Sequence, residues 1–228
     1  MKTGKKVFLG FIFLAVVFTI GSLFGIRYLT ITANYLLIPI LILYYRYETK
    51  NWFFLLVLAL FFFYIRDIFL FYDFSNFNYV VMVTFFAGLM IIYGFAVTGF
   101  PKAKVHLVEW ISLFIMYGFL GFLFYTIADL VPEVISDFTF RAYAYLFLLV
   151  FLLAITFTAY LLKSHYASLW LMLASASLLV SEISLFFKMY VISDISVELF
   201  YPVFHVIAYY SLIEHGLHRR RSAEIPYF

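Results

Sequence analysis

Four residues that can carry charge interrupt otherwise apolar stretches of this chain. Arg66 and Asp67 are adjacent in one stretch, Glu182 lies in a second and His205 in a third. An ionisable side chain inside such a stretch is costly unless it is paired or solvated. A carboxylic acid kept protonated by apolar surroundings can donate a proton, and a second, ionised carboxylate can stabilise the cation that forms, as in glycosidases. These residue types therefore indicate general acid chemistry.

The composition indicates that a lipid bilayer surrounds these residues. Of the 228 residues, 67% are hydrophobic and 12% are charged, and the mean hydropathy is +1.07. An ordinary soluble domain is about half apolar and about a quarter charged, so a soluble fold of this composition would expose large apolar areas to water. The chain has no cysteine, which excludes disulfides, zinc–thiolate sites and thiol nucleophiles.

We expect an all-α membrane protein, with residues 1–228 forming a single polytopic domain of about eight transmembrane helices. The apolar segments lack the alternation of β-strands and are too long for barrel strands. Most are close to the roughly 20 residues that cross a hydrocarbon core. The expected helices span about 7–26, 30–46, 52–72, 78–98, 106–128, 142–162, 167–188 and 198–214.

Lys and Arg are unevenly distributed between the two sides of this predicted bilayer. An even number of spans places both termini on one side, and that side holds 11 of the 15 basic residues. The other side holds Arg27, Arg141 and Lys188. The positive-inside rule therefore predicts cytoplasmic termini, in a protein of the cell or inner membrane.

The ionisable residues within the spans share one predicted depth. Asp67 lies six residues before the external residue Asp73, and Glu182 lies six residues before Lys188, which is about 9 Å along a helix. His205 lies seven residues past the external start of the last segment. We therefore expect the two acids and the histidine to line one cavity in the outer half of the bilayer.

The segments around the two acids are similar to each other. Residues 66–72, Arg-Asp-Ile-Phe-Leu-Phe-Tyr, align with residues 181–187, Ser-Glu-Ile-Ser-Leu-Phe-Phe, with three identities. The third and seventh predicted helices are four apart and run in the same direction, so the match fits a parallel 4+4 internal repeat. Such a repeat would place the two acids facing each other near a pseudo-two-fold axis.

The layout of the whole chain resembles the YhhN family, which includes the lysoplasmalogenases. Family members have about eight spans, a proline early in the second helix, Gly-Asp in the third, G-A-x-L-F-x-x-S-D in the seventh, and Gln or His after an aromatic-rich start to the last. The corresponding residues here are Pro39, Arg66-Asp67, Ser175-Ala176-Ser177-Leu178-Leu179-Val180-Ser181-Glu182 and Tyr201-Pro202-Val203-Phe204-His205.

The sequence departs from the family pattern at four positions. Ile38 replaces the lysine that usually precedes the proline, Arg66 replaces the glycine, and Glu182 replaces the second aspartate. Leu89 stands near the place of a histidine that the fourth helix often carries. Both acids remain, so the resemblance implies that the acid chemistry is retained. It does not identify the substrate.

The resemblance implies hydrolysis of the vinyl ether bond of a lysoplasmalogen-like lipid, which releases a fatty aldehyde and a glycerophospho-base. We assign Glu182 as the acid and Asp67 as the carboxylate that stabilises the cation. The residues assigned to positioning the substrate or water are His205, Arg66, Asn34 and Tyr201. A membrane lipid is the implied partner, with no cofactor, no metal and no nucleic acid.

Other interpretations of the same residues stay open. A small transporter or carrier, a non-catalytic sensor or assembly protein, and a structural lock between the acids and His205 are alternatives. Adjacent side chains diverge by about 100° on a helix, so Arg66 need not pair with Asp67 and instead extends toward the interface in one interpretation. His215 and His218 are spaced like a metal pair, but we interpret them as an interfacial cap.

Overall fold

The computed structural model describes residues 3–98, 106–134, 139–191 and 194–224, and all regular structure in these ranges is helical. Apart from the groups at its ends, each helix satisfies its backbone hydrogen bonds within its own segment, which is what a hydrocarbon environment demands. The seven helices are α1 (Thr3–Leu23), α2 (Arg27–Thr49), α3 (Phe54–Thr98), α4 (Leu107–Val134), α5 (Thr139–Lys163), α6 (Tyr166–Tyr190) and α7 (Ile195–Glu224).

Helix α3 is long enough to cross a bilayer twice, and it doubles back on itself. The rings of Phe63 and Phe85 lie 5.7 Å apart, although the 22 residues between them would cover about 33 Å of a straight helix. The rings of Phe69 and Phe77 are 4.8 Å apart, which places the bend close to residues 72–76. Two antiparallel arms, Phe54–Tyr72 and Asn76–Thr98, are therefore the third and fourth spans.

The described residues thus contain eight helices long and apolar enough to cross a membrane, which confirms the predicted all-α fold class and the architecture of an integral membrane protein. The predicted break between the third and fourth spans is a bend within continuous helix rather than a loop. The spans are Thr3–Leu23, Arg27–Thr49, Phe54–Tyr72, Asn76–Thr98, Leu107–Val131, Thr139–Lys163, Tyr166–Tyr190 and Ile195–Arg219.

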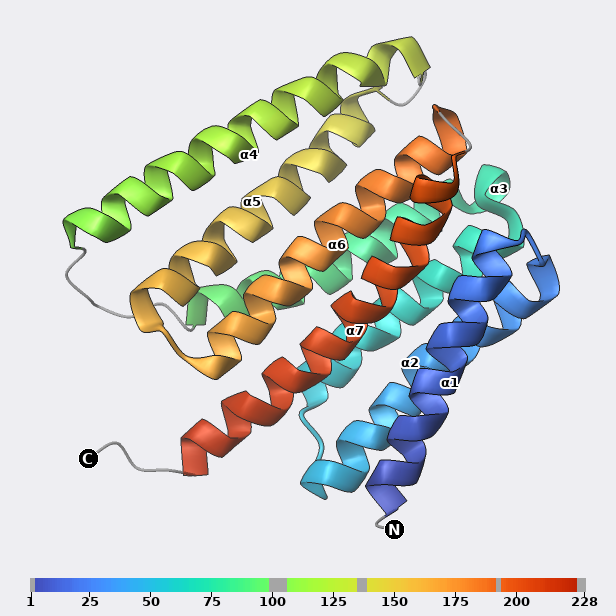
Figure 1. The fold of residues 1–228 in the computed structure, drawn as a ribbon, viewed down its shortest axis with the longest axis horizontal. Helices are drawn as coiled ribbons and strands as arrows, with labels where there is room; N and C mark the ends of the chain where they lie inside the picture. Colours follow the sequence, from blue (N-terminus) through green and yellow to red (C-terminus); the bar gives the residue numbers. More distant parts are fainter. Residues whose placement is uncertain (1–2, 99–105, 135–138, 192–193, 225–228) are drawn as a thin grey trace.

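The helices form two layers. Helices α4, α5, α6, α7 and α1 follow one another across one layer, and α3 lies behind them (Figure 1). Helix α1 begins and α7 ends at the same end of the bundle (Figure 1). We call this the terminal end and the opposite one the distal end. Which of the two faces the cytoplasm stays a prediction.

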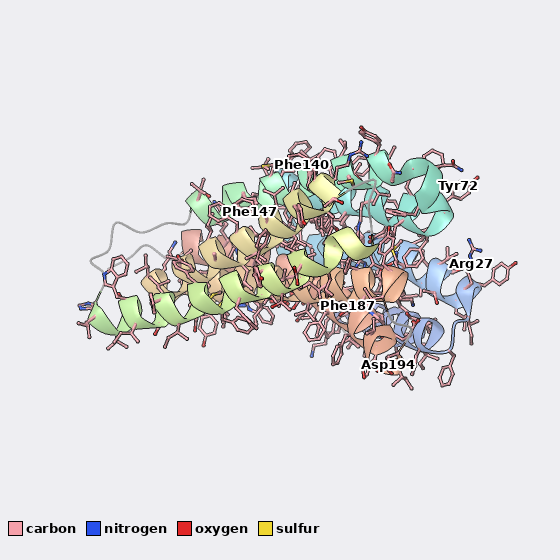
Figure 2. The ribbon with its side chains drawn as sticks, turned by 90° about the horizontal axis from the view of Figure 1, so that it is seen from above. Arg27, Tyr72, Phe140, Phe147, Phe187 and Asp194 are labelled. Atoms are coloured by element: carbon pink, nitrogen blue, oxygen red, sulfur yellow. The ribbon has the colours of Figure 1, made fainter. Side chains whose placement is uncertain are left out.

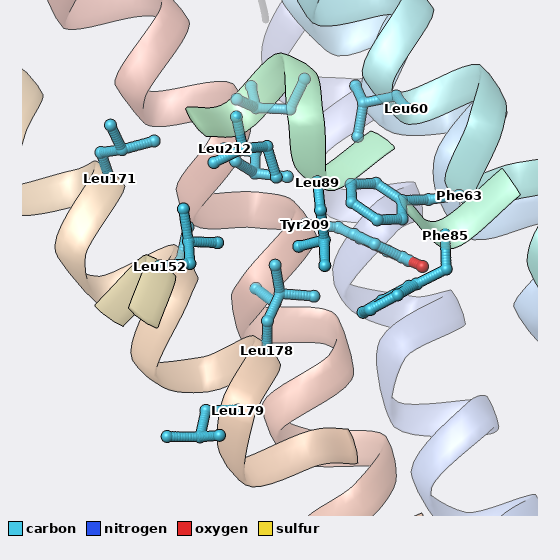
Figure 3. Close-up of a cluster of buried hydrophobic side chains, with 14 of the residues drawn as sticks. Leu60, Phe63, Phe85, Leu89, Leu152, Leu171, Leu178, Leu179, Tyr209 and Leu212 are labelled. Carbon is cyan, nitrogen blue, oxygen red and sulfur yellow. The ribbon is translucent and has the colours of Figure 1, made fainter. Parts of the chain in front are cut away.

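The packed core consists of aromatic and aliphatic side chains from all seven helices, and where α3 and α7 meet it includes Phe63, Phe85 and Tyr209 (Figure 3). The two arms of α3 approach closely because residue 88 is glycine. A Cβ added there would lie 2.9 Å from the Phe63 ring, and such small-residue contacts are how helices pack tightly in membranes.

Outside this core, large apolar side chains point away from the bundle, Phe140 and Phe147 among them (Figure 2). Helix α4 is the most peripheral span and presents a row of exposed aromatic residues that includes Trp110 and Phe114. This surface suits lipid. The polar side chains that concern function are instead gathered between α3, α5, α6 and α7.

Candidate functional site

Arg66 lies at the centre of a buried polar cluster. Its residue is only 1% exposed, so the interpretation in which it extends toward the interface is wrong. One guanidinium nitrogen, Nη1, donates to Asp67 Oδ1 at 2.8 Å, and Nη2 donates to Glu182 Oε2 at 2.5 Å. The planar fork of the guanidinium thus joins α3 to α6 and engages both acids at once.

Asp67 is held on three sides. Besides Arg66, its other oxygen, Oδ2, accepts a hydrogen bond from the Tyr209 hydroxyl at 2.7 Å and lies 3.1 Å from His205 Nε2. Both partners come from α7, and they lie four residues apart, so one face of that helix presents them together. Asp67 therefore ties the first arm of α3 to α7 and has a donor for each oxygen.

Glu182 has fewer partners than Asp67. Its Oε2 accepts from Arg66 and from the hydroxyl of Tyr145 on α5. Its Oε1 is buried, and within the described part of the chain no side chain or backbone group hydrogen-bonds to it. Buried polar atoms are nearly always hydrogen-bonded, so this oxygen is available to a proton or to a ligand.

A cavity of about 440 Å³ opens beside Glu182, and Arg66 and Tyr145 line it as well. On α6 its wall runs from Glu182 to Tyr190, which is about 12 Å along a helix toward the distal end. Between these ends the wall is apolar and includes Leu185 and Phe186. The size falls within the roughly 300–1,000 Å³ of ordinary ligand pockets.

The distal part of the cavity has polar side chains of its own. Asn78 and Arg141 line it there. The Arg141 guanidinium lies 4.3 Å from the centroid of the Tyr79 ring and donates to the Tyr79 hydroxyl at 2.7 Å. The cavity is therefore apolar along its length and polar at both ends, which is the pattern of an amphiphilic ligand.

The structure brings together the three ionisable residues that the sequence placed at one depth, but only one of them faces the cavity. Glu182 lines it, whereas Asp67 and His205 are absent from its lining and lie on the other side of Arg66. The expectation that all three line one cavity is therefore wrong in this respect. The cause is the length of the Arg66 side chain, which fills the space between the two acids.

The two remaining predicted site residues are buried without joining the hydrogen bonds of the cluster. Asn34 on α2 is buried, and its amide nitrogen and oxygen find no partner among the described residues. The Tyr201 ring packs 5.3 Å from the His205 ring, while its hydroxyl has no partner within the same ranges. Neither residue lines the cavity.

Two residues that contact the acids were missed in the sequence. Tyr145 bonds Glu182 and Tyr209 bonds Asp67, yet nothing distinguishes them among 20 tyrosines. For Tyr209 the spacing of four from His205 was a usable signal, since both had to lie on one face of the last helix. Tyr145 had no such signal because it is on a helix without ionisable groups at that depth.

The described residues hold no group of three or more metal-ligating side chains. His215 is turned inward, with Nδ1 2.7 Å from the backbone oxygen of Ala167. His218 instead lies 3.7 Å from Glu214. The two histidines thus serve different contacts, and the interpretation of both as an interfacial cap is wrong for His215, which is only 4% exposed. The two acids meet at Arg66, as an internal repeat would place them, but the repeat itself stays a prediction.

No family model, no curated protein and no solved structure matches this chain. The fold and the site therefore define its class. It is an integral membrane protein with an apolar cavity that ends at the buried group of Arg66, Glu182 and Tyr145.

Proposed function

We propose that this protein is a membrane-embedded hydrolase of the lysoplasmalogenase type, which binds one amphiphilic lipid in the cavity and cleaves it beside Glu182. The observation that carries the proposal is the position of the Glu182 carboxyl, which is buried, open on one oxygen and placed at the end of an apolar cavity. General acids must reach the reacting atom within hydrogen-bond distance, and Glu182 is the only carboxyl among the described residues that line the cavity.

The charge of the cluster supports a proton on this site. Arg66 carries one positive charge, and ionised Asp67 and Glu182 carry one negative charge each, so these three side chains together have a net charge of −1. One bound proton makes it neutral. Since an unbalanced charge within the membrane costs several kcal/mol, one proton bound by an acid or by His205 is favoured, and Glu182 is the acid of the cluster that can pass it to a ligand in the cavity.

For a vinyl ether the sequence of steps is short. The Glu182 carboxyl gives its proton to the vinyl carbon remote from the ether oxygen, which leaves a cation shared by the other carbon and that oxygen. Water adds to this carbon and returns a proton to the Glu182 carboxylate. The hemiacetal then breaks into a fatty aldehyde and a glycerophospho alcohol. Tyr145, bonded to Glu182, holds the carboxyl in position throughout.

The test is aldehyde release from a lysoplasmalogen by the purified protein in lipid nanodiscs. Glu182→Gln keeps the shape of the side chain but has no proton to give, so turnover should fall by about 10²–10⁴ while lipid binding changes little. Ser184→Ala is the matched control, because Ser184 lies on the same helix and donates only to Val180 at 2.8 Å. Full activity of Glu182→Gln would refute the mechanism.

A carrier is the second candidate, and the way that Arg66 engages both acids favours it. When two carboxylates share one buried cation, one of these ion pairs can open as a proton or a charged substrate binds in its place. A carrier predicts flux of the lipid across liposomes without aldehyde. An unmutated protein that is inactive on the vinyl ether yet moves lipid between leaflets would therefore replace the hydrolase by the carrier.

A further inference from the structure

A second, smaller cavity lies at the terminal end of the bundle, far from Glu182. Its volume is about 90 Å³, and on the same measure roughly 10–15 Å³ holds one water, so it has room for a group the size of a phosphate. Thr98 and Lys163, which are exposed at helix ends, border it and open it to the aqueous side. The second arm of α3, α5, α6 and α7 all contribute to its wall.

His215 presents a buried and unpartnered nitrogen to this cavity. The residue is 4% exposed, and its ring is stacked 5.7 Å from the Phe95 ring, which fixes its orientation. Because Nδ1 faces the Ala167 carbonyl oxygen at 2.7 Å, Nδ1 carries the proton, and Nε2 is left with a lone pair. Within the described residues Nε2 has no hydrogen-bond partner, so it calls for a ligand that donates.

The charged side chains of the wall are cations. Lys163 and Arg219 line the cavity, and no acid does so among the described residues. Arg219 is held in place by donating to Thr98 Oγ1 at 3.1 Å. Glu214, an acid one turn earlier on the same helix, lies 3.7 Å from His218 and does not line the cavity. The cavity therefore carries two positive charges that suit an anion.

The first turn of α6 adds to this field. Ala167 and Ser168 line the cavity, and the positive end of a helix dipole favours an anion at such a position. His165 caps the helix by accepting from the Ala167 amide at 3.0 Å through Nδ1, so its proton is on Nε2. Burial lowers the pKa of His165, and Lys163 and His218 lower it further, so the ring is neutral at pH 7.

We propose that this cavity binds a phosphate or phosphomonoester group. Lys163 and Arg219 hold its anionic oxygens, and His215 Nε2 accepts the hydrogen of its P–OH group. The lone pair of Nε2 is what selects this anion. Sulfate has the same size and shape but no hydrogen to donate at neutral pH, so it leaves Nε2 unsatisfied and binds more weakly.

Two sources can supply this group, namely free phosphate and the head group of a phosphatidic-acid-type lipid. Free phosphate keeps a P–OH group in both of its forms at neutral pH, whereas a phosphomonoester presents one as its monoanion. The position at the end of the spans is within reach of a lipid head group, and the small volume has room for the phosphate alone.

The experiment titrates the purified protein in detergent with inorganic phosphate and, separately, with sulfate at equal ionic strength. Phosphate should bind at least about tenfold more tightly than sulfate. Lys163→Gln and Arg219→Gln should each weaken phosphate binding by about tenfold, as expected for one charge-assisted hydrogen bond. Lys163 is exposed, so its substitution leaves the fold intact. Lys6→Gln is the matched control, because Lys6 is an exposed lysine on α1 outside the cavity.

A second arm identifies the source. The protein is purified from phosphatidylcholine vesicles with and without phosphatidic acid, and the retained lipid is measured by mass spectrometry. Retention of phosphatidic acid that is lost in Lys163→Gln assigns the group to a lipid, and phosphate binding without lipid retention assigns it to the free anion. Equal binding of sulfate and phosphate, no effect of either substitution, or no binding in both arms would overturn the proposal.

Discussion

Replacing Arg66 by methionine should destabilise the protein strongly, because it removes the cation that lies between two buried acids. Arg66 donates to Asp67 and to Glu182, and methionine fills part of the same volume without charge. Removing one partner of a buried ion pair costs about 3–5 kcal/mol. We expect the low end, about 3 kcal/mol, since Tyr209 and His205 continue to bond Asp67 and Tyr145 continues to bond Glu182.

The loss should be recovered unequally by second substitutions. Asp67 keeps two partners without Arg66, whereas Glu182 keeps one. Glu182→Gln in the Arg66→Met background should therefore restore more stability than Asp67→Asn does. The assay is reversible unfolding in mixed micelles of sodium dodecyl sulfate and a mild detergent, followed by circular dichroism, with the single and double variants of each pair in two double-mutant cycles.

Arg141→Met is the matched control, because Arg141 is a half-buried arginine that stacks on Tyr79. It should cost about 1 kcal/mol or less. A loss in Arg66→Met no larger than that of Arg141→Met would refute the shared ion pair. Equal recovery by the two second substitutions would refute the difference in their partners.

Two further predictions concern the topology and Tyr145. Reporter fusions after Lys163 should read cytoplasmic and those after Asp194 external, and the reverse result would overturn the orientation taken from the basic residues. Tyr145→Phe keeps the stack on Phe85, whose ring centroid is 4.5 Å away, but it removes the hydrogen bond to Glu182. Turnover should fall by about tenfold with little change in KM, whereas Tyr93→Phe, whose hydroxyl bonds only Leu148, should leave turnover unchanged.

The fold was predictable because a hydrocarbon environment leaves few choices. Apolar segments of about 20 residues must form helices, and the eight predicted spans correspond to the eight observed ones. The bend of α3 was less predictable. Residues 72–76 lack a proline or glycine, so nothing marks whether the chain leaves the helix there or turns while keeping its hydrogen bonds.

The composition of the site was predictable and its geometry was not. The cost of charge in lipid indicates Arg66, Asp67, Glu182 and His205 directly. Which of these side chains contact one another depends on their length and direction, and helical spacing does not describe either. Arg66 and Asp67 point in different directions from the backbone, yet the long guanidinium side chain turns back to bond the neighbouring carboxylate.

The position of Arg66 changes the role that Asp67 can have. In glycosidases both carboxyls face the substrate, whereas here the guanidinium stands between Asp67 and Glu182 and shares the cavity wall with Glu182. If the Arg66 guanidinium acted alone, its positive charge would destabilise a cation formed from the substrate. Asp67 balances it: once Glu182 has given up its proton, the cluster carries a net charge of −1 while the substrate carries +1. On the proposed pathway the membrane interior stays neutral at each step, and Asp67 acts through charge balance rather than by contact with the substrate.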